Sequence, residues 1–552
     1  MARRIRWQIV IAALSTLLIG GLLGRLAVST AAISSPLVGG TYVESVTGTP
    51  QKPIPLLNDP VADPVGRDLA TLLYDGLLRI GADGLIEPAL ASSYEVDPTG
   101  TSYIFRLRRD IVWHDGQPFG ADDVLFTLRT LQVLEQPGDP ALTAFWQDLL
   151  VDRIDEATVR VTLNEPLASF PSLARIRILP AHLLASIPPE RWLESAYASQ
   201  LIGTGPYRLV ELRDERAILA ANQRYFDGRP FIEQIELRFV TTRETALAAL
   251  SRGDTTAFGE RLRLEHAGLN PPAGLSAPSV PLDEYTVLSF NLRRSSLADQ
   301  RLRQALAHGL NKDELITRAL AETARPIDTP ILPGSWAFSP EVSWYTPDRD
   351  AAERILEELG YVRGSDGRQT REGLPLSFEL LVDSEVRRRA AADEVVRQWG
   401  ELGITVTVRE LDSPQLITQL RRGSFDMAIH SWARLGPDPD PFALWYSGSS
   451  LNYTGLRDEL IDQLLENAHQ ESELAARSSD YAAFQQRWTE LVPSITLYQP
   501  LYRFTSDPSL GGTGFDEPAS AISGLLFGPE DRYRSVTRWF TNSYREIQGE
   551  LR

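Results

Sequence analysis

The sequence predicts an α/β protein with two lobes, and three observations lead to this prediction. Several segments of the first half alternate apolar and polar residues, as half-buried strands do. Between residues 346 and 411 a strand, a helix and a second strand follow one another through short links, which is the pattern of a βαβ unit. A helical pair over 297–321 precedes that unit. Two such regions joined by extended segments indicate a cleft between lobes, the usual place of a small-ligand site.

The N-terminus predicts an export signal or a membrane anchor. Arg3, Arg4 and Arg6 form a basic flank, and no charge occurs from Gln8 to Gly24. An apolar run of this length behind a basic end is typical of a secretory signal or a single membrane span. We assign residues 1–35 to this segment and its linker, and both cleavage and retention remain open. The body is therefore expected outside the cytoplasm, at the cell surface or in the periplasm, either tethered or secreted.

The first half of the body predicts strands and hairpin turns. Strands are expected around Phe105, Val161 and Leu237, because apolar residues alternate on both sides of each. Asp115-Gly116 and Asp227-Gly228 are typical of tight turns. His114 beside Asp115 could suggest a catalytic dyad, but no nucleophile accompanies the pair, so we interpret it as part of the turn.

The second half shows a clean change of period. A helix is expected from Pro347 to Gly360, followed by a strand over 376–382. A helix over 386–403 and a strand over 404–408 complete the βαβ unit. Short links between these elements predict a parallel pair of strands with the helix packed on one face.

Composition and missing motifs exclude several classes of function. The 552 residues carry a net charge of −18, which disfavours a nucleic-acid partner because phosphate would repel the chain. No cysteine is present, so thiol nucleophiles, disulfides and cysteine–zinc sites are excluded. The two lysines, Lys52 and Lys312, do not follow a glycine, which excludes a Walker A loop. The six histidines are scattered. We expect no metal site and no cofactor.

Five blocks of sequence resemble the solute-binding proteins of ABC importers for peptides, nickel and related solutes. In chain order they begin at Leu72 (LLYDGLLRIGADGLIEPALASSYEVDPTGTSYIFRLRRDIVWHDGQPFGADDVLFTL), Gly203 (GTGPYRLVE, then NQRYFDGRPFIEQIELRFV), Ser289 (SFNLRRSSLADQRLRQALAHGLNKDELI), Phe425 (FDMAIHSWARLGPDPDPFALW) and Asn452 (NYTGLRDELIDQLL). The order matches that of the family over most of the chain.

The resemblance implies a class II periplasmic binding protein fold, with two α/β lobes, a hinge and an extra domain inserted in the first lobe. The corresponding ranges are 36–72, 199–284 and 497–552 for lobe I, 73–198 for the inserted domain, and 285–496 for lobe II. The chain is expected to cross between the lobes near Phe290, Asn291 and Thr496. Two ordinary strands at these positions are the alternative.

The resemblance also implies ligand contacts after the strand that begins at Met427. It places Trp432 beside the ligand, where an indole offers a broad apolar face, although packing in the core is the alternative. Dipeptide binders of the family carry an aspartate three residues later, which pairs with the α-ammonium group of the peptide. Leu435 occupies that position, so this anchor is missing. Arg434 could hold a carboxylate or a phosphate, or remain a solvated surface side chain.

Five further residues are candidates for the cleft, each with a structural alternative. Asp438 lies in a proline-rich turn and could reach the ligand from the rim or only shape the turn. The others could donate hydrogen bonds or present an aromatic ring near the mouth; they are Asn452, Tyr453, Trp336 and Tyr498.

The predicted function is capture of a peptide-like solute by a monomeric, non-enzymatic binding protein that delivers it to an ABC permease. A nickel chelate, an opine or an oligosaccharide is the alternative solute on the same scaffold. A sensory receptor and an extracytoplasmic hydrolase are alternatives from other classes. The hydrolase would require two facing carboxylates at catalytic separation, and no motif places them.

Overall fold

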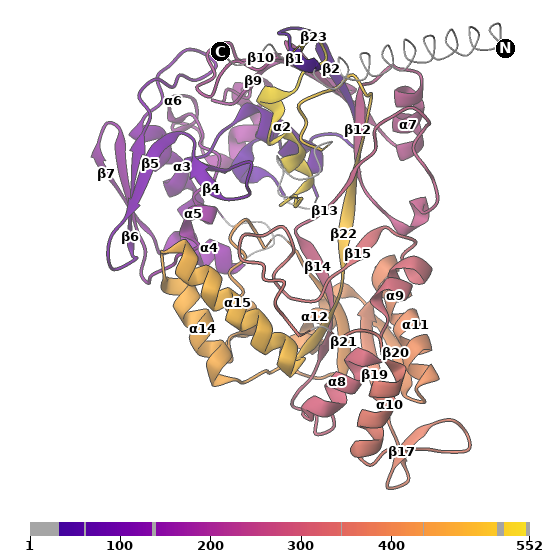
Figure 1. Cartoon of the computed structure of the whole chain (residues 1–552). Coiled ribbons are helices and arrows are strands. Elements are labelled where there is room, and N and C mark those ends of the chain that lie inside the picture. The colour runs from indigo at the N-terminus through magenta and orange to yellow at the C-terminus, as the bar shows by residue number, and fades with distance from the viewer. Residues whose placement is uncertain are drawn as a thin grey trace, which may run out of the picture.

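The computed structural model of the chain describes residues 32–59, 62–134, 140–343, 345–433, 435–515 and 524–547. Two lobes share one long mixed sheet of twelve strands (Figure 1). Its main path runs β20-β19-β21-β14-β22-β12-β2-β11-β10-β9, and β13 and β15 also pair with β22. The sequence predicts functional segments in both lobes, so the strands that cross between the lobes determine how these segments meet.

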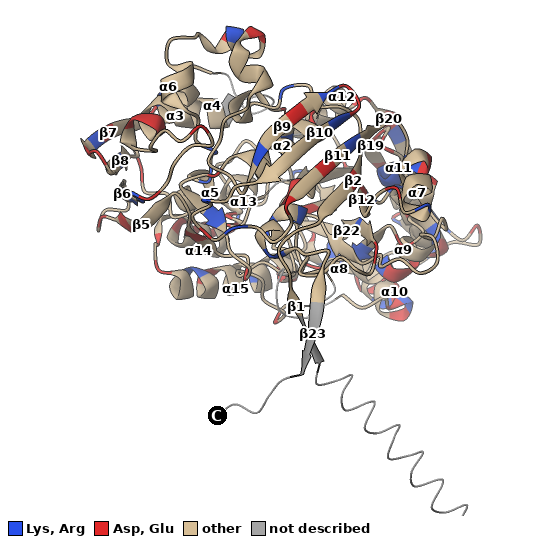
Figure 2. Ribbon diagram, turned by 90° about the horizontal axis from the view of Figure 1, so that it is seen from above, with Lys and Arg blue, Asp and Glu red and all other residues tan. Residues whose placement is uncertain are grey.

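Lobe I contains the β12 to β9 part of the sheet. Its strands and helices are β2 (Thr41–Thr47), α2 (Pro64–Leu73), β9 (Tyr207–Arg213), β10 (Arg216–Ala221), β11 (Gln234–Val240), α7 (Arg243–Ser251), β12 (Ala257–Arg261) and β13 (Ser279–Pro281). β2 pairs in parallel with both β11 and β12. β1 (Ala32–Pro36) and β23 (Ser543–Ile547) pair with each other and project from the body (Figure 2).

The inserted domain follows α2 and carries a separate four-stranded sheet of order β5-β6-β8-β7. Its elements are β3 (Leu78–Ile80), β4 (Ile86–Pro88), β5 (Ala91–Val96), β6 (Ser102–Leu107), α3 (Ala121–Val133), α4 (Pro140–Gln147), β7 (Leu150–Asp155), β8 (Thr158–Thr162), α5 (Phe170–Leu173) and α6 (Ala181–Leu184). One continuous hydrophobic core contains Tyr42 and Leu237 of lobe I together with Phe105 and Val161 of this domain. The two therefore form one packed body.

Lobe II contains the predicted βαβ unit and two further helical layers. Its strands are β14 (Glu284–Phe290), β15 (Ala324–Pro326), the hairpin β16 to β18 (Val362–Arg363, Gln369–Arg371 and Leu374–Pro375), β19 (Ser377–Asp383), β20 (Thr405–Leu411) and β21 (Met427–Ala433). Its helices are α8 (Gln300–His308), α9 (Lys312–Ala319), α10 (Arg349–Glu358), α11 (Val386–Glu401), α12 (Ser413–Arg422), α13 (Phe442–Trp445), α14 (Glu459–Gln470) and α15 (Leu474–Leu491). The core of this lobe is distinct from that of lobe I.

Local sequence signals explain these elements. β19 and β20 pair in parallel on either side of α11, which confirms the predicted βαβ unit. α10 ends two residues before Gly360, whose φ of +83° lies in the left-handed region that glycine tolerates best. The alternating segments around Phe105, Val161 and Leu237 form β6, β8 and β11, as predicted.

β22 (Ser494–Ser506) joins the lobes because it is long enough to serve both halves of the sheet. Its first part pairs with β14 of lobe II, up to Tyr498. Its last part pairs with β12 of lobe I, from Tyr502 onward. The second connection runs from the end of β13 at Pro281 to the start of β14 at Glu284.

The residues predicted at the hinge lie on β14, on β22 and directly after β14, a few residues from these crossings. Phe290 pairs with Met427, and Thr496 pairs with Val287, so both lie within the lobe II sheet. The side-chain amide of Asn291 donates to the carbonyl groups of Gly423 and Phe425, at 2.9 and 2.7 Å. The apolar pattern marks these segments as strands but does not show which neighbour each residue meets, and the change of neighbour comes several residues away.

A buried charge network ties the C-terminal part of the chain into lobe I. The guanidinium of Arg532 donates to Glu44 at 2.8 Å and to Asp68 at 2.7 Å. The hydroxyl of Tyr533 donates to Glu44 at 2.6 Å. One cation and two carboxylates are thus brought together from β2, α2 and the C-terminal segment, which fixes their relative positions.

Candidate functional site

Trp432 lies near the end of β21, where the lobe II sheet approaches lobe I. Its half-buried indole stacks on the ring of Tyr453, with ring centres 5.3 Å apart and an angle of 21°. The ring of His430 meets it edge-on at 5.2 Å. Tyr453 is itself buried, so it supports Trp432 and fixes the direction of the indole. The structure therefore joins two of the predicted site residues.

The loop after β21 reaches a hydrophobic cluster formed by both lobes. Leu435 packs there, together with Trp432. Ile80, Leu525 and Phe527 come from the lobe I side, and the lobe II side contributes Tyr285, Val287, Ile327 and Leu332. An apolar cluster of this kind holds the lobes together when they are closed, because separation would expose it to water.

A cavity of about 330 Å³ adjoins this cluster. Leu131, Leu142 and Trp146 form an apolar wall in the inserted domain, and Phe527 belongs both to the cavity and to the interlobe cluster. Gly436 lines the cavity from the loop of lobe II. The cavity thus lies between lobe I and the inserted domain, and Gly436 is the lining residue from lobe II. Its volume falls at the lower end of the range typical of small-ligand pockets, about 300–1,000 Å³.

Five charged residues line the cavity: Arg67, Arg175, Arg177, Glu530 and Asp531. Arg67 pairs with Glu530. Asp531 accepts from Arg534 at 3.2 Å and from the backbone amide of Phe527 at 2.8 Å. Both carboxylates of the cavity lining therefore have partners, and the remaining charged residues of the lining are Arg175 and Arg177.

Arg175 and Arg177 are held by neutral groups. The Nε of Arg175 donates to the carbonyl of Ser172 at 2.9 Å, and Nη2 of Arg177 donates to the hydroxyl of Thr71 at 2.6 Å. Among the described residues no carboxylate lies within 4.0 Å of either guanidinium. Burial lowers the pKa of Arg175 to about 10 and also lowers that of Arg177.

The segment that carries both arginines is fixed by close packing against the start of the inserted domain. Gly76 and Arg177 form an antiparallel bridge, and the amide of Ile178 donates to the carbonyl of Asp75 at 2.9 Å. A Cβ atom at Gly76 would lie 2.4 Å from the carbonyl oxygen of Arg175. Glycine is therefore required at this approach, and the two arginines occupy a rigid wall.

Asp283 connects the cavity loop to the crossing between the lobes. It lies between β13 and β14, and its Oδ2 accepts the backbone amide of Gly436 at 2.7 Å. Burial is the main cause that raises its pKa to about 8, and the nearby charge of Asp531 raises it further. Asp283 is therefore largely protonated at neutral pH and contributes little negative charge to the cavity.

Asp438 is not one of the residues that line the cavity, and its carboxylate is used in an ion pair inside lobe II. Its two oxygens accept from Nη1 and Nη2 of Arg477 at 2.6 and 2.7 Å, and its side chain is 9% exposed. The guanidinium of Arg477 also lies 5.1 Å from the ring centre of Trp336. Arg477 lies 39 residues further along the chain, and no local pattern announces this pairing.

Three other predicted contacts are used inside the protein. The indole of Trp336 donates to the carbonyl of Pro437 at 3.0 Å. The amide of Asn452 donates to the carbonyl of Leu456 at 2.9 Å, and its oxygen accepts from Thr454 and Gly455. Tyr498 is 1% exposed in the core of lobe II. Arg434 lies outside the described residues.

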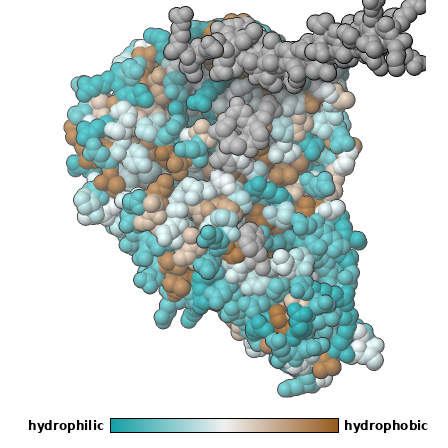
Figure 3. Space-filling view, in the orientation of Figure 1, coloured by the Kyte–Doolittle hydropathy of each residue, from teal (hydrophilic) through white to brown (hydrophobic). Residues whose placement is uncertain are grey.

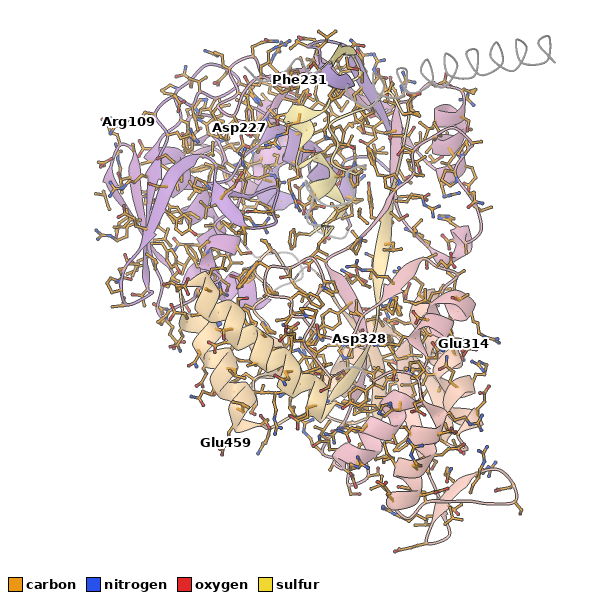
Figure 4. The ribbon with its side chains drawn as sticks, viewed as in Figure 1. Arg109, Asp227, Phe231, Glu314, Asp328 and Glu459 are labelled. Carbon is orange, nitrogen blue, oxygen red and sulfur yellow. The ribbon has the colours of Figure 1, made fainter. Side chains whose placement is uncertain are left out.

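The inserted domain also contacts lobe II directly, beside this loop. Ser169 is 3.2 Å from the carboxylate of Asp440, and the amide of Ala168 donates to the carbonyl of His469 at 2.8 Å. His469 in turn contacts Asp440 at 2.7 Å. Figure 1 shows α14 and α15 below the inserted domain, and Figure 4 marks Glu459, the first residue of α14. The inserted domain and lobe II are thus in direct contact beside this loop.

A buried serine–histidine contact in lobe II does not form a reactive dyad. The hydroxyl of Ser289 lies 2.9 Å from Nε2 of His430. Both residues are at most 5% exposed, and burial lowers the pKa of His430 to about 3. His114 contacts the backbone of Gly203 and Gly205, in agreement with a structural role. Among the described residues no group of three or more acidic or histidine side chains is placed to hold a metal ion.

The residues that the sequence prediction missed are Arg175, Arg177, Gly436 and Phe527. The two arginines alternate with apolar residues in the short stretch ARIRI, which is a weak sign of a half-buried, charged wall. No sequence pattern connects this stretch with Phe527 or Gly436, which lie hundreds of residues away.

Comparison with known proteins places the chain in a family. The profile of the bacterial extracellular solute-binding proteins, family 5 (middle region), matches residues 86–454. This chain belongs to that family. The Bacillus subtilis oligopeptide-binding protein AppA is 24% identical over 493 residues, which cover 86% of this chain and 89% of that protein.

Solved structures show the same two-lobe fold. HbpA2 from Haemophilus parasuis superposes with a TM-score of 0.75 at 22% identity, over 86% of this chain and 96% of that one. NikZ from Campylobacter jejuni, solved in complex with Ni(L-His), superposes with a TM-score of 0.64 at 24% identity, over 91% and 99% of the two chains. The predicted class II periplasmic binding protein fold is confirmed.

Proposed function

We propose that this chain is the extracytoplasmic solute-binding protein of an ABC importer, which captures a solute between its lobes and delivers it unchanged to the permease. The observation that supports this proposal most directly is the cavity of about 330 Å³ between the inserted domain and the loop after β21. A solute in this place contacts both lobes, and these contacts stabilise the closed form over the open one.

The solute that we propose is peptide-like and short. Relatives are named as oligopeptide-, di/tripeptide- and dipeptide-binding proteins. The cavity volume lies at the lower end of the range for small-ligand pockets, which suits a short peptide better than an extended one. Trp432 and Phe527 offer apolar surface to a side chain next to the cavity.

The remaining features of the proposal concern location and partners. The basic, apolar N-terminus of the sequence supports export, with the body tethered or released. The N-terminal segment lies outside the described residues, and among those described no helix is long and apolar enough to span a bilayer. We propose a monomer that docks on permease subunits. The face shown in Figure 3 is largely hydrophilic over lobe II, as a protein that diffuses to its partner requires.

Native mass spectrometry tests the capture of solute. The purified body is incubated with an equimolar library of di- and tripeptides, and the mass of any bound species is read after exchange into volatile buffer. We expect bound peptides to be recovered unaltered, and small-angle scattering to show a smaller radius of gyration after binding. Recovery of cleaved peptides would contradict the proposal, as would peptide binding at an unchanged radius.

A further inference from the structure

The strongest unexplained feature of the cavity is its charge. The Arg67–Glu530 and Arg534–Asp531 pairs each combine one cation and one anion. Arg175 and Arg177 add two cations, and their described hydrogen bonds go to neutral oxygens. Asp531 and Asp283 act electrostatically on Arg175, and Asp531 and Asp75 act on Arg177. The pKa of Asp283 is raised to about 8, so its carboxyl group is largely protonated at neutral pH. The cavity therefore carries an excess of positive charge.

An excess of buried positive charge is costly unless an anion compensates it. Removing a guanidinium from water costs several kcal/mol, and proteins offset this cost with a paired carboxylate. Arg477 and Arg532 follow this rule elsewhere in the molecule, each with a carboxylate at 2.8 Å or less. Arg303 of lobe II is an exception to this rule, because it is 3% exposed and donates to backbone carbonyls. Arg175 and Arg177 differ from Arg303 in that they line the cavity.

The apolar part of the cavity lining selects the rest of the ligand. Leu131, Leu142 and Trp146 offer apolar surface, and Phe527 continues it toward Leu435. A small molecule with a carboxylate at one end and an apolar body matches both walls. An ammonium group would meet two arginines and no free carboxylate among the described lining residues.

We propose that Arg175 and Arg177 form a subsite for a carboxylate of the captured solute, with the apolar body of that solute against Trp146 and Phe527. The planar guanidinium groups donate to the carboxylate in pairs, which gives direction as well as charge compensation. Recognition thus depends on the acid end of the solute and needs no free amino group. This inference rests on the proposed function, because the ligand of the subsite is the solute itself.

The test uses probes that differ in one group. 3-Phenylpropanoate carries a carboxylate and an apolar ring, and 3-phenylpropanamide replaces the carboxylate with a neutral amide. Isothermal titration of the full body should show the acid binding at least tenfold more tightly than the amide. In the double variant Arg175→Gln, Arg177→Gln, the acid should bind at least tenfold more weakly, and binding of the amide should not change.

Three controls separate the subsite from general effects. Arg191→Gln removes an exposed arginine of the same domain and should leave both titrations unchanged. The double lysine variant, Arg175→Lys with Arg177→Lys, keeps the charge without the planar fork and should bind the acid with intermediate affinity. The melting temperature of the glutamine variant should equal or exceed that of the wild type, because the variant removes two half-buried cations that have no carboxylate partner.

The outcomes distinguish the subsite from the identity of the solute. Equal binding of acid and amide overturns the inference, as does unchanged binding of the acid to the folded glutamine variant or a failure of the wild type to bind either probe. The dipeptide Leu-Phe and its amide form a second matched pair. If 3-phenylpropanoate binds through the arginines and no peptide binds, the carboxylate subsite stands and the peptide proposal fails.

Discussion

Two arginine sites of this protein are built in opposite ways. In lobe II, Arg477 is 4% exposed and meets Asp438 through two hydrogen bonds of 2.6 and 2.7 Å. Beside the cavity, Arg175 and Arg177 donate to a carbonyl and a hydroxyl instead. The comparison teaches that a matched arginine marks architecture, whereas an unmatched one at a cavity marks a place reserved for a ligand.

The largest effect is expected where the pair is complete. Arg477→Ala leaves the carboxylate of Asp438 buried without a cation, and we expect it to lower the free energy of unfolding by about 3–5 kcal/mol. Urea denaturation followed by circular dichroism measures this change. The double variant Arg477→Met, Asp438→Leu removes both charges and should recover most of the loss; a double variant as unstable as Arg477→Ala would contradict the pairing argument.

A smaller effect on stability, with a large one on binding, is expected at Trp432. The indole is half-buried and stacks on Tyr453, so Trp432→Ala should weaken solute binding at least tenfold, about 1.4 kcal/mol or more. Its cost to unfolding should stay below that of Arg477→Ala. Titration and denaturation on the same preparation compare the two. A collapse of the melting temperature would assign Trp432 to the core.

Replacing a single arginine that has no carboxylate partner is expected to change the free energy of unfolding in the opposite direction. Arg175→Met replaces a half-buried cation that has no carboxylate partner with an apolar side chain of similar length, and we expect the protein to become more stable by about 1 kcal/mol. Differential scanning calorimetry at low ionic strength gives the shift in melting temperature. A loss of stability equal to that of Arg477→Ala would show that Arg175 is as structural as Arg477, and the contrast between the two regions would disappear.

A pH-dependent effect is expected at Asp283. Asp283 has a pKa of about 8 in the folded protein, far above the value of about 3.9 in an unfolded chain. The folded state therefore binds more protons between these values, and the contribution of this group to stability falls as pH rises toward 8. The charges near it are Asp531, Glu284 and Arg175. Asp283→Asn should flatten the stability profile between pH 5 and pH 8; an unchanged profile would exclude Asp283 as its source.

The fold could be predicted in detail where segments with the two-residue period of a strand alternate with segments of helical period. The βαβ unit of β19, α11 and β20 is visible in the sequence, because alternating strands and a helical stripe follow one another within about 35 residues. The sequence does not show where β22 crosses between the lobes, because a strand that pairs in both halves of the sheet has the same apolar pattern throughout. Only the partners, β14 up to Tyr498 and β12 from Tyr502, locate the change.

The site was predictable only in part, for a related reason. Trp432 and Leu435 are local to one loop, and the structure brings them to the meeting of the lobes. Asp438 follows three residues after Leu435, and its carboxylate pairs with Arg477 of α15. Arg175 and Arg177 could not be predicted as cavity residues, because the cavity forms only where the fold brings Gly436 from lobe II and Phe527 from the C-terminal segment beside them.

The separate cores of the two lobes have a consequence for heat-induced unfolding. Lobe I and the inserted domain share one hydrophobic core, and lobe II is built around another. Each core is a cooperative unit, so the empty protein should lose them in two resolvable steps of heat uptake. A ligand that contacts Arg175 and Gly436 at once would couple the unfolding of the two units. The two steps of heat uptake should therefore merge as the ligand is added.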